Sequence, residues 1–156
     1  MRQKRKTISG STSRTKSSLL VFFLILAADQ VSKLFIRLNL MPGDSFDLGM
    51  LSITYLRNTG VSFGLFKGFN AIFTIVLMAA FAFFACIWVK KAGFRLQISI
   101  ILAGISGNLI DRLFLGYVVD FINLKIWPIF NIADSAISLG IIWLVLESIR
   151  RKEDIF

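Results

Sequence analysis

The residues best suited to chemistry are two aspartates that lie between apolar segments, Asp120 and Asp134. An unpaired carboxylate at the edge of the hydrocarbon layer is costly, and acids within membrane segments usually have a function. Two carboxylates held close together share one proton, because both cannot ionise cheaply. The ionised member can activate water, while the protonated member polarises an amide carbonyl and later protonates the leaving nitrogen. These residues therefore predict an aspartyl protease at the outer face of a membrane.

Further polar residues accompany the two aspartates at the spacing of a helix turn. Asn131 precedes Asp134 by three residues, and Asn108 precedes Asp111 by three, so each pair is expected on one helix face. The two asparagines can hold carboxylates by hydrogen bonds without adding charge. Arg112 can offset the negative charge of the site or bind a substrate carbonyl.

A third set of polar residues lies near the end of the first apolar segment. Asp29, Lys33 and Arg37 recur every four residues and so share one helical stripe. We expect Asp29 and Lys33 to pair and Arg37 to extend toward the membrane surface. An ion pair that orients the helix end explains this pattern as well as a catalytic role does. Asn58 precedes Gly60 in a turn, and capping of that turn explains its position without a role in substrate binding.

The composition places this chemistry in a membrane protein. Hydrophobic residues make up 56% of the 156 residues and occur in long blocks. Charged residues make up 17%, against about a quarter in ordinary soluble domains. The chain has no histidine and one cysteine, which excludes the usual zinc sites, a Ser-His triad and a Cys-His pair. We therefore expect no cofactor and no metal.

Four apolar segments have the length of membrane spans. The segment 69–89 holds twenty-one uncharged residues, close to the ~20 that cross a bilayer core. Small residues in the third segment, Gly104 and Gly107, permit close helix approach. The fold class expected is a mainly α, polytopic membrane protein. Its four helices cover approximately residues 19–38, 69–89, 96–115 and 129–146.

The remaining segments are polar or turn-rich. Residues 1–17 are basic and rich in serine and threonine, so we expect a disordered cytoplasmic tail, although an organellar presequence has a similar composition. Alternating residues and turn signals in 40–68 predict a small β-region at the water interface, including a strand at 61–63. Residues 116–128 are expected to form an outer loop. Residues 18–150 would then form one four-helix domain, followed by a cytoplasmic C-terminal tail at 151–156.

The distribution of lysine and arginine predicts how the chain crosses the membrane. With the N-terminus inside, the cytoplasmic segments hold twelve of these residues and the outer segments three. Both termini are therefore expected in the cytoplasm. The net charge of +9 does not indicate nucleic-acid binding, because the basic residues are not interleaved with aromatic residues that could stack on bases.

This orientation brings the polar residues of five segments to one depth, near the extracytoplasmic interface. A transport pathway would instead place polar groups through the whole thickness of the bilayer. The pattern favours an interfacial enzyme over two alternatives, a small proton-coupled carrier that uses the same acids and a non-enzymatic assembly protein with buried ion pairs. Any single aspartate is explained equally well as a buried structural acid.

Five blocks of sequence, in order, resemble the bacterial lipoprotein signal peptidases, or signal peptidase II. The resemblance covers about residues 19–150 and implies that Asp120 and Asp134 are the catalytic pair. It also implies structural or substrate-contacting roles for eight residues: Asp29, Lys33, Asn58, Gly60, Asn108, Asp111, Arg112 and Asn131. The long basic tail departs from the family pattern. The blocks are DQVSK at 29–33, RNTGVSFGLF at 57–66, GNLIDR at 107–112, VVDF at 118–121 and FNIAD at 130–134.

The resemblance also implies a substrate that composition cannot indicate. It would be a prolipoprotein whose cysteine already carries diacylglycerol, cut just N-terminal to that cysteine. The expected location is the bacterial cytoplasmic (inner) membrane, with the active site near the extracytoplasmic face. Partners would be diacylated prolipoproteins and membrane lipid, with no nucleic acid and no metal, and the protein is expected to be a monomer.

Overall fold

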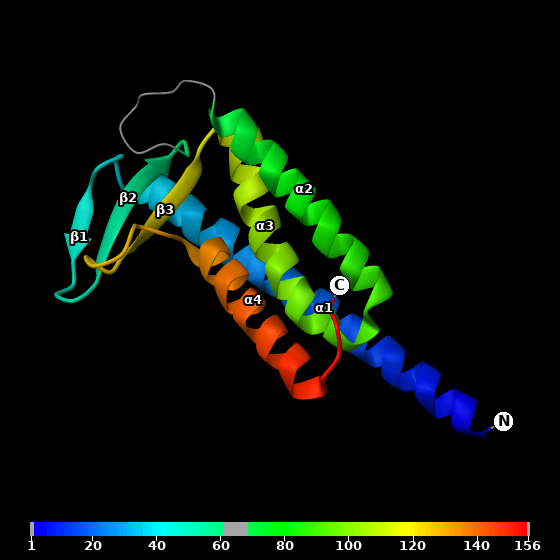
Figure 1. Ribbon diagram of the computed structural model, residues 1–156. Helices are drawn as coiled ribbons and strands as arrows, with labels where there is room; N and C mark the ends of the chain where they lie inside the picture. Colours follow the sequence, from blue (N-terminus) through cyan, green and yellow to red (C-terminus); the bar gives the residue numbers. More distant parts are fainter. Residues whose placement is uncertain (1, 61–68, 156) are drawn as a thin grey trace.

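The chain folds into four long helices with a small sheet at one end of the bundle (Figure 1). The computed structural model describes residues 2–60 and 69–155, with side chains from residue 15 onward apart from that of residue 69. Both termini lie away from the sheet (Figure 1). The long helices are α1 (Arg2–Asn39), α2 (Phe69–Lys90), α3 (Arg95–Leu115) and α4 (Ile132–Arg151), and a short 3-10 helix, η1 (Ala92–Phe94), precedes α3.

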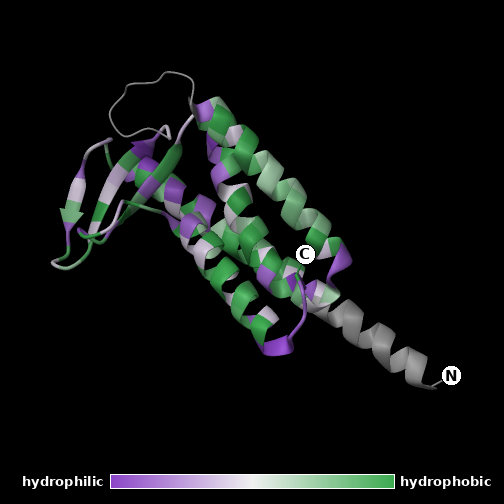
Figure 2. Ribbon diagram, viewed as in Figure 1, coloured by the Kyte–Doolittle hydropathy of each residue, from purple (hydrophilic) through white to green (hydrophobic). Residues whose placement is uncertain are grey.

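All four long helices are long and apolar enough to cross a membrane. Apolar residues cover most of their length, and polar residues gather near the sheet and at the opposite end (Figure 2). Helix α3 is the central helix, because 61% of its most apolar window is buried, against 11% to 28% in the other three helices. The predicted fold class, mainly helical with four membrane-spanning helices and a small β-region, is confirmed.

Two glycines let α3 approach its neighbours closely. A Cβ added at Gly104 would collide with the backbone carbonyl of Ala133 in α4. A Cβ at Gly107 would collide with the carboxylate of Asp29 in α1. Because neither position has room for a side chain, small residues at this interface set the distance between the helices, as is common in membranes.

The sheet is antiparallel and has three strands in the order β1 (Ser45–Asp47), β2 (Ser52–Asn58) and β3 (Val118–Asn123). The register of β2 and β3 pairs Asn58 with Val118 and Leu56 with Asp120, and a bulge follows between Ile53 and Leu56. Tyr55, Val119 and Phe121 are buried and pack against Ile36 at the end of α1. This apolar cluster fixes the sheet to the helix bundle.

Several predicted boundaries differ from the structure. Residues 2–17, expected as a disordered tail, continue α1 as a helix, because extending a formed helix avoids the cost of nucleation. The predicted loop 116–128 contains β3, whose pairing with β2 depends on a partner far away in sequence. The expected strand at 61–63 lies outside the described residues.

The fourth span begins and ends later than predicted, at residues 132 and 151 instead of 129 and 146. It begins later because Asn131 is the N-cap and Phe130 forms a bridge with Ile122 of β3. It ends later because Glu147 forms ion pairs with Arg150 and Arg151, three and four residues further on, and such pairs stabilise the last turn.

Candidate active site

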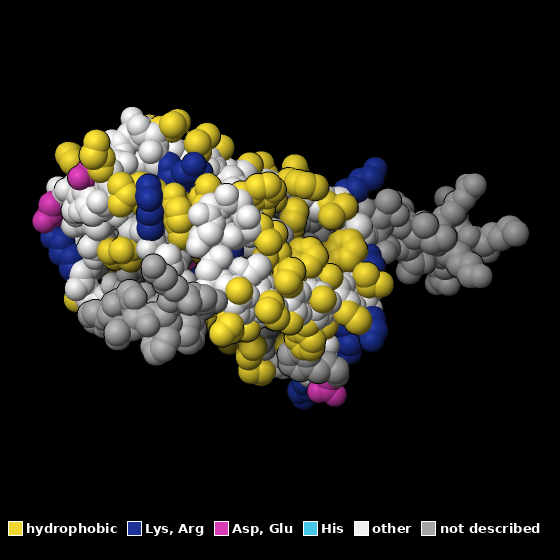
Figure 3. Space-filling view, turned by 90° about the horizontal axis from the view of Figure 1, so that it is seen from above, with side chains coloured by type: hydrophobic (Ala, Val, Ile, Leu, Met, Phe, Trp, Pro, Cys, Tyr) yellow, Lys and Arg dark blue, Asp and Glu magenta, His cyan; other side chains and the backbone are white. Residues whose placement is uncertain are grey.

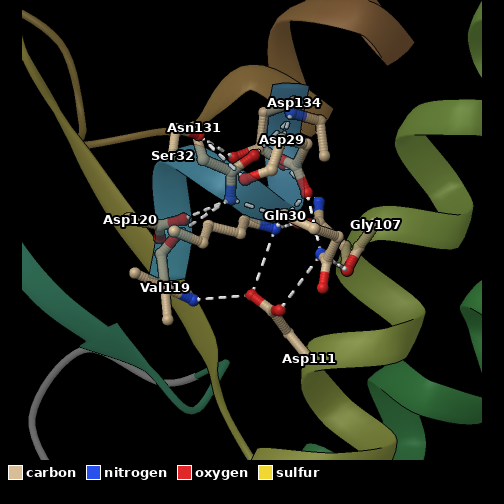
Figure 4. Close-up of polar contacts among 12 residues, drawn as sticks. Asp29, Gln30, Ser32, Gly107, Asp111, Val119, Asp120, Asn131 and Asp134 are labelled. Carbon is tan, nitrogen blue, oxygen red and sulfur yellow. Dashed lines mark hydrogen bonds and ion pairs between the residues drawn. The ribbon is translucent and has the colours of Figure 1, made fainter. Parts of the chain in front are cut away.

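Asp120 and Asp134 line one cavity, of about 200 Å³, beside the sheet. Asp120 lies in β3, and Asp134 lies in the first turn of α4. The short connection from β3 to α4 folds back because Phe130 pairs with Ile122 of β3. The side chains come from α1, α3, α4 and β3 and converge in one place (Figure 4).

Asp120 is almost completely buried, with 1% of its surface exposed. Its Oδ1 accepts a hydrogen bond from Asn131 Nδ2 at 2.7 Å, and its Oδ2 accepts one from Asn58 Nδ2 at 2.9 Å. Burial raises the pKa of Asp120 to about 7, with a smaller contribution from the charge of Asp134, although both amide donors act in the opposite direction. The Asp120 carboxyl group can therefore carry a proton near neutral pH.

Asp134 lies in a different environment at the N-terminus of α4. Its side chain accepts from the backbone N–H of Asn131 at 3.2 Å, and its own backbone N–H donates to Asn131 Oδ1 at 2.9 Å. This reciprocal pair is a capping box, and a helix N-terminus attracts negative charge. Asn108 Nδ2 donates to Asp134 Oδ1 at 2.7 Å. Asp134 is half-buried and lines the cavity.

Two asparagines connect the carboxyl groups. Asn131 Nδ2 donates to Asn108 Oδ1 at 3.1 Å as well as to Asp120. Asn108 in turn donates to Asp134. The series Asp120, Asn131, Asn108 and Asp134 is thus continuous, and it holds both carboxyl groups by neutral amides, as expected from the spacing of the asparagines.

A buried ion-pair network lies beside these asparagines. Lys33 Nζ is 2.9 Å from Asp29 Oδ2 and 3.1 Å from Asp111 Oδ2, and it donates to Asn108 Oδ1 at 3.0 Å. The expected pairing of Asp29 with Lys33 is confirmed. All three charged side chains are at most 3% exposed, so each depends on the others for compensation of its charge.

The same network ties together four elements of the fold. Asp29 Oδ1 accepts from the backbone N–H of Ala133 in α4 at 2.8 Å. Asp111 Oδ2 accepts from the backbone N–H of Val119 in β3 at 3.0 Å. Gln30 Nε2 contacts Asp29 at 3.1 Å and Asp111 at 3.4 Å. Helices α1 and α3 therefore fix the positions of β3 and α4, which carry Asp120 and Asp134.

Arg112 lines the cavity and is held from the α2 side. Its Nη1 donates to Asn70 Oδ1 at 2.8 Å, and its guanidinium lies 5.1 Å above the centre of the Phe73 ring. Its Nε is buried and has no hydrogen-bond partner among the described residues. Arg112 is therefore fixed beside the cavity by Asn70 and Phe73, and it keeps one buried donor unused.

Asn58 both caps a turn and reaches the site. Its Oδ1 accepts from the backbone N–H of Gly60 at 2.8 Å, while its Nδ2 donates to Asp120. Gly60 has φ +92°, and a Cβ there would collide with the Phe73 ring. Gly60 thus serves the turn and the packing of Phe73, while Asn58 contacts the carboxyl group directly.

Sequence reasoning missed three contributors: Gln30, Asn70 and Phe73. Gln30 follows Asp29 directly and gave no periodic signal of its own. Asn70 and Thr74 are polar residues four apart in an otherwise apolar span, and that spacing could have indicated a polar contact. The position of Phe73 beneath Arg112 follows from packing of α2 on α3, which sequence does not reveal.

Comparison with known proteins gives one consistent result. A family model described as Signal peptidase (SPase) II matches residues 21–150. The chain is 42% identical to a lipoprotein signal peptidase of Moorella thermoacetica over 135 residues, and 45% identical to one of Dehalococcoides mccartyi over 143 residues. Each of these alignments covers 81% of this chain and 88% of the relative.

A solved structure supports the same grouping. It is described as a bacterial membrane enzyme and is similar to this chain with a TM-score of 0.77 and 34% sequence identity. The similarity covers 87% of this chain and 88% of the solved chain. Fold and sequence therefore agree over nearly the same part of the molecule.

Proposed function

This chain belongs to the signal peptidase II family of aspartic proteases, and we propose that Asp120 and Asp134 are its catalytic pair. The protein is a multi-pass bacterial membrane enzyme that removes signal peptides from prolipoproteins. The observation that supports the catalytic assignment is the series of amides that joins the two aspartates at one cavity. Family membership favours this activity over the proton-coupled carrier.

The two environments suggest different roles for the two aspartates. Burial raises the pKa of Asp120 to about 7, so Asp120 is the member that holds the shared proton. Asp134 lies at a helix N-terminus, which favours negative charge, so it is the member that accepts a proton from water. The different surroundings of the two carboxyl groups thus support this assignment of roles.

The reaction then proceeds by direct attack of water, assisted by proton transfers to and from the two aspartates. Water attacks the carbonyl carbon of the scissile amide and gives a proton to Asp134, while Asp120 gives its proton to the carbonyl oxygen. As the tetrahedral intermediate collapses, the C–N bond breaks and the leaving nitrogen takes the proton from Asp134. A hydroxyl proton of the intermediate returns to Asp120, so that the products are a carboxylic acid and an amine.

Neighbouring residues position the substrate and the pair. We propose that the Arg112 guanidinium, which Asn70 and Phe73 hold at the cavity, binds a substrate carbonyl. Asn58 and Asn131 hold Asp120. The remaining five residues named from the resemblance support the site. Asp29, Lys33, Asn108 and Asp111 form the buried polar network, in which Asn108 also donates to Asp134, and Gly60 packs against Phe73.

The proposed substrate and its location come from the family resemblance and the charge distribution, and the surface of the bundle is compatible with them. The substrate is a prolipoprotein with a diacylglyceryl cysteine, cut N-terminal to that cysteine at the extracytoplasmic face. Figure 3 shows apolar side chains over the helices, with charged side chains gathered toward the sheet and the opposite end. Acyl chains can therefore stay in lipid beside the helices while the scissile bond meets water at the carboxyl groups.

The test is a gel-shift cleavage assay on purified protein with a diacylated prolipoprotein. Asp120→Asn and Asp134→Asn should each abolish cleavage while the protein keeps its melting temperature within a few degrees. Asp47→Asn is a matched control, because it changes an exposed aspartate in β1 that does not line the cavity. Full activity in either Asp120→Asn or Asp134→Asn would remove that aspartate from the catalytic pair.

A further inference from the structure

A second cavity, of about 270 Å³, lies at the end of the bundle opposite the sheet. It is formed where α1, the start of α3 and the end of α4 meet. Its lining includes a serine, two arginines, a buried glutamine, a tryptophan and a glutamate. These residues are Ser17, Arg95, Gln97, Trp143, Glu147 and Arg151. None of them belongs to the candidate active site, so the cavity needs a separate explanation.

The cavity is positively charged, and its arginines are held in place. Arg95 Nε donates to the Trp88 carbonyl at 3.2 Å, and its guanidinium lies 4.9 Å above the centre of the Trp88 ring system. Arg151 lies 5.2 Å above the centre of the Phe94 ring and pairs with Glu147 at 2.6 Å. Glu147 also pairs with Arg150. Two guanidinium groups and one carboxylate therefore line the cavity, which leaves a net charge of +1 in its lining.

The N-terminus of α3 adds to this positive potential. Ala92, Gly93 and Leu96 line the cavity beside Arg95, so the cavity lies against the first turn of that helix. The N-cap residue, Phe94, provides no side-chain hydrogen bond to this turn. A helix N-terminus without a side-chain cap attracts anions through its backbone N–H groups and the helix dipole.

Gln97 supplies a second observation that points to a ligand in this cavity. Its side chain is only 4% exposed, and its Oε1 is buried without a hydrogen-bond partner in the described part of the chain. A buried amide oxygen without a donor is costly and therefore uncommon. A ligand with a hydrogen-bond donor as well as a negative charge would satisfy Gln97 and match the arginines of the lining.

We propose that this cavity binds the headgroup of an anionic phospholipid that carries free hydroxyl groups, such as phosphatidylglycerol. The phosphate lies between Arg95, Arg151 and the first turn of α3, and a headgroup hydroxyl donates to Gln97 Oε1. A lipid source is favoured over a free phosphate because Leu20 and Leu146 are each 60% exposed on the two helices that bound the cavity, where acyl chains would run.

Binding is measured by native mass spectrometry of the full chain in a zwitterionic detergent, titrated with defined ligands. Phosphatidylglycerol is compared with phosphatidylmethanol, which has the same charge but no headgroup hydroxyl, and with zwitterionic phosphatidylcholine and phosphatidylethanolamine. Glycerol phosphate tests the free-anion source. The expected order is phosphatidylglycerol first, phosphatidylmethanol second, and the other three at least about tenfold weaker than phosphatidylglycerol.

Two variants separate the charge from the hydroxyl contact. Arg95→Gln should weaken phosphatidylglycerol and phosphatidylmethanol alike, by about tenfold. Gln97→Leu should weaken phosphatidylglycerol alone and remove its advantage over phosphatidylmethanol. Lys90→Gln is the control, because Lys90 is an exposed basic residue near the same end of the bundle and outside the cavity lining. It should leave all affinities unchanged.

Several results would overturn the proposal. Equal affinity of the wild-type protein for phosphatidylglycerol and phosphatidylmethanol would remove the role of Gln97, and equal affinity for glycerol phosphate would assign the cavity to a free anion. Tightest binding of phosphatidylethanolamine would reject an anionic ligand. Cleavage of prolipoprotein checks that each variant is folded. If Arg95→Gln is inactive, the proposal is tested by whether Gln97→Leu loses the preference for phosphatidylglycerol over phosphatidylmethanol. Asp120→Asn should bind phosphatidylglycerol normally, so this test is separate from that of the catalytic pair.

Discussion

The side-chain nitrogen of Asn131 lies 3.1 Å from the side-chain oxygen of Asn108, and this contact joins the hydrogen-bond partners of two aspartates. Asn131 belongs to the N-cap of α4 and also donates to Asp120, while Asn108 belongs to α3 and donates to Asp134. A change at either asparagine is therefore expected to affect both carboxyl groups.

The first prediction concerns Asn131. Asn131→Asp keeps a good N-cap residue but replaces the donor to Asp120 with a second negative charge. We expect the cleavage rate to fall at least about a hundredfold. The pKa in the pH profile of the remaining activity should rise, because a nearby negative charge favours the protonated form of Asp120. Asn131→Ser, which also caps but adds no charge, should lose activity without that upward movement. Rate measurements from pH 5 to 9 distinguish the two variants.

The second prediction concerns pH. Asp120 has a folded pKa of about 7, above its ordinary value of 3.8, so the folded protein holds this proton more tightly than the unfolded chain does. Stability from this group is fully present below pH 3.8 and is lost as pH rises toward 7. Activity that needs the protonated Asp120 should decline above about pH 7, by about tenfold per pH unit.

The measurement is the pH profile of kcat/KM together with the melting temperature from pH 4 to 9. Asp120→Asn removes the titrating group, so its melting temperature should depend less on pH than that of the wild-type protein. A wild-type rate that keeps rising through pH 9 would contradict the assignment of the proton to Asp120.

The third prediction compares two Lys–Asp ion pairs of similar length. Lys33 and Asp29 lie 2.9 Å apart and are buried, whereas Lys125 and Asp47 lie 2.8 Å apart and are exposed. Lys33→Met leaves Asp29 and Asp111 without their cation, and the expected loss is about 3 to 5 kcal/mol of unfolding free energy. Lys125→Met should hardly change stability, because water and salt screen the exposed pair. Thermal unfolding in detergent measures the stability of both variants. Equal losses of unfolding free energy would show that burial does not determine how much each ion pair contributes to stability.

The fourth prediction concerns Gly107. Gly107→Ala places a methyl group against the Asp29 carboxylate, which must then move away from Lys33 and from the Ala133 N–H. We expect a loss of about 1 to 3 kcal/mol of stability from overpacking and a fall in kcat, since Asp29 fixes the start of α4. Combining Gly107→Ala with Asp29→Ala makes room for the methyl group, so the two effects should be less than additive. The measurement is a double-mutant cycle of unfolding free energies. Strictly additive losses for Gly107→Ala and Asp29→Ala would mean that the two residues do not interact.

The fifth prediction concerns metals. The chain has no histidine and one cysteine, and the described residues contain no group of three or more side chains suited to hold a metal ion. Treatment with EDTA or 1,10-phenanthroline should therefore leave the cleavage rate unchanged. Inhibition that added zinc reverses would refute a mechanism based on two carboxyl groups alone.

The helices and the local polar pairs were predictable from the sequence. Four long apolar segments predicted four spans, because a helix must bury about 20 apolar residues to cross a bilayer. The pairing of Asp29 with Lys33 follows from the helix repeat, since residues four apart are neighbours on one helix face. Asn131 and Asp134, three residues apart, form a capping box for the same local reason.

Only the tertiary structure decided which of these local groups meet. Asn58 reaches Asp120 across 62 residues because β2 pairs with β3, and the residue spacing contains no information on that register. Lys33 contacts Asp111 only because Gly107 lets α1 and α3 pack closely. Local contacts follow from backbone geometry that every helix shares, whereas contacts between elements depend on how complete side-chain surfaces fit together. The sequence by itself therefore determined the spans and the acidic residues, and packing decided that two of those acids share one cavity.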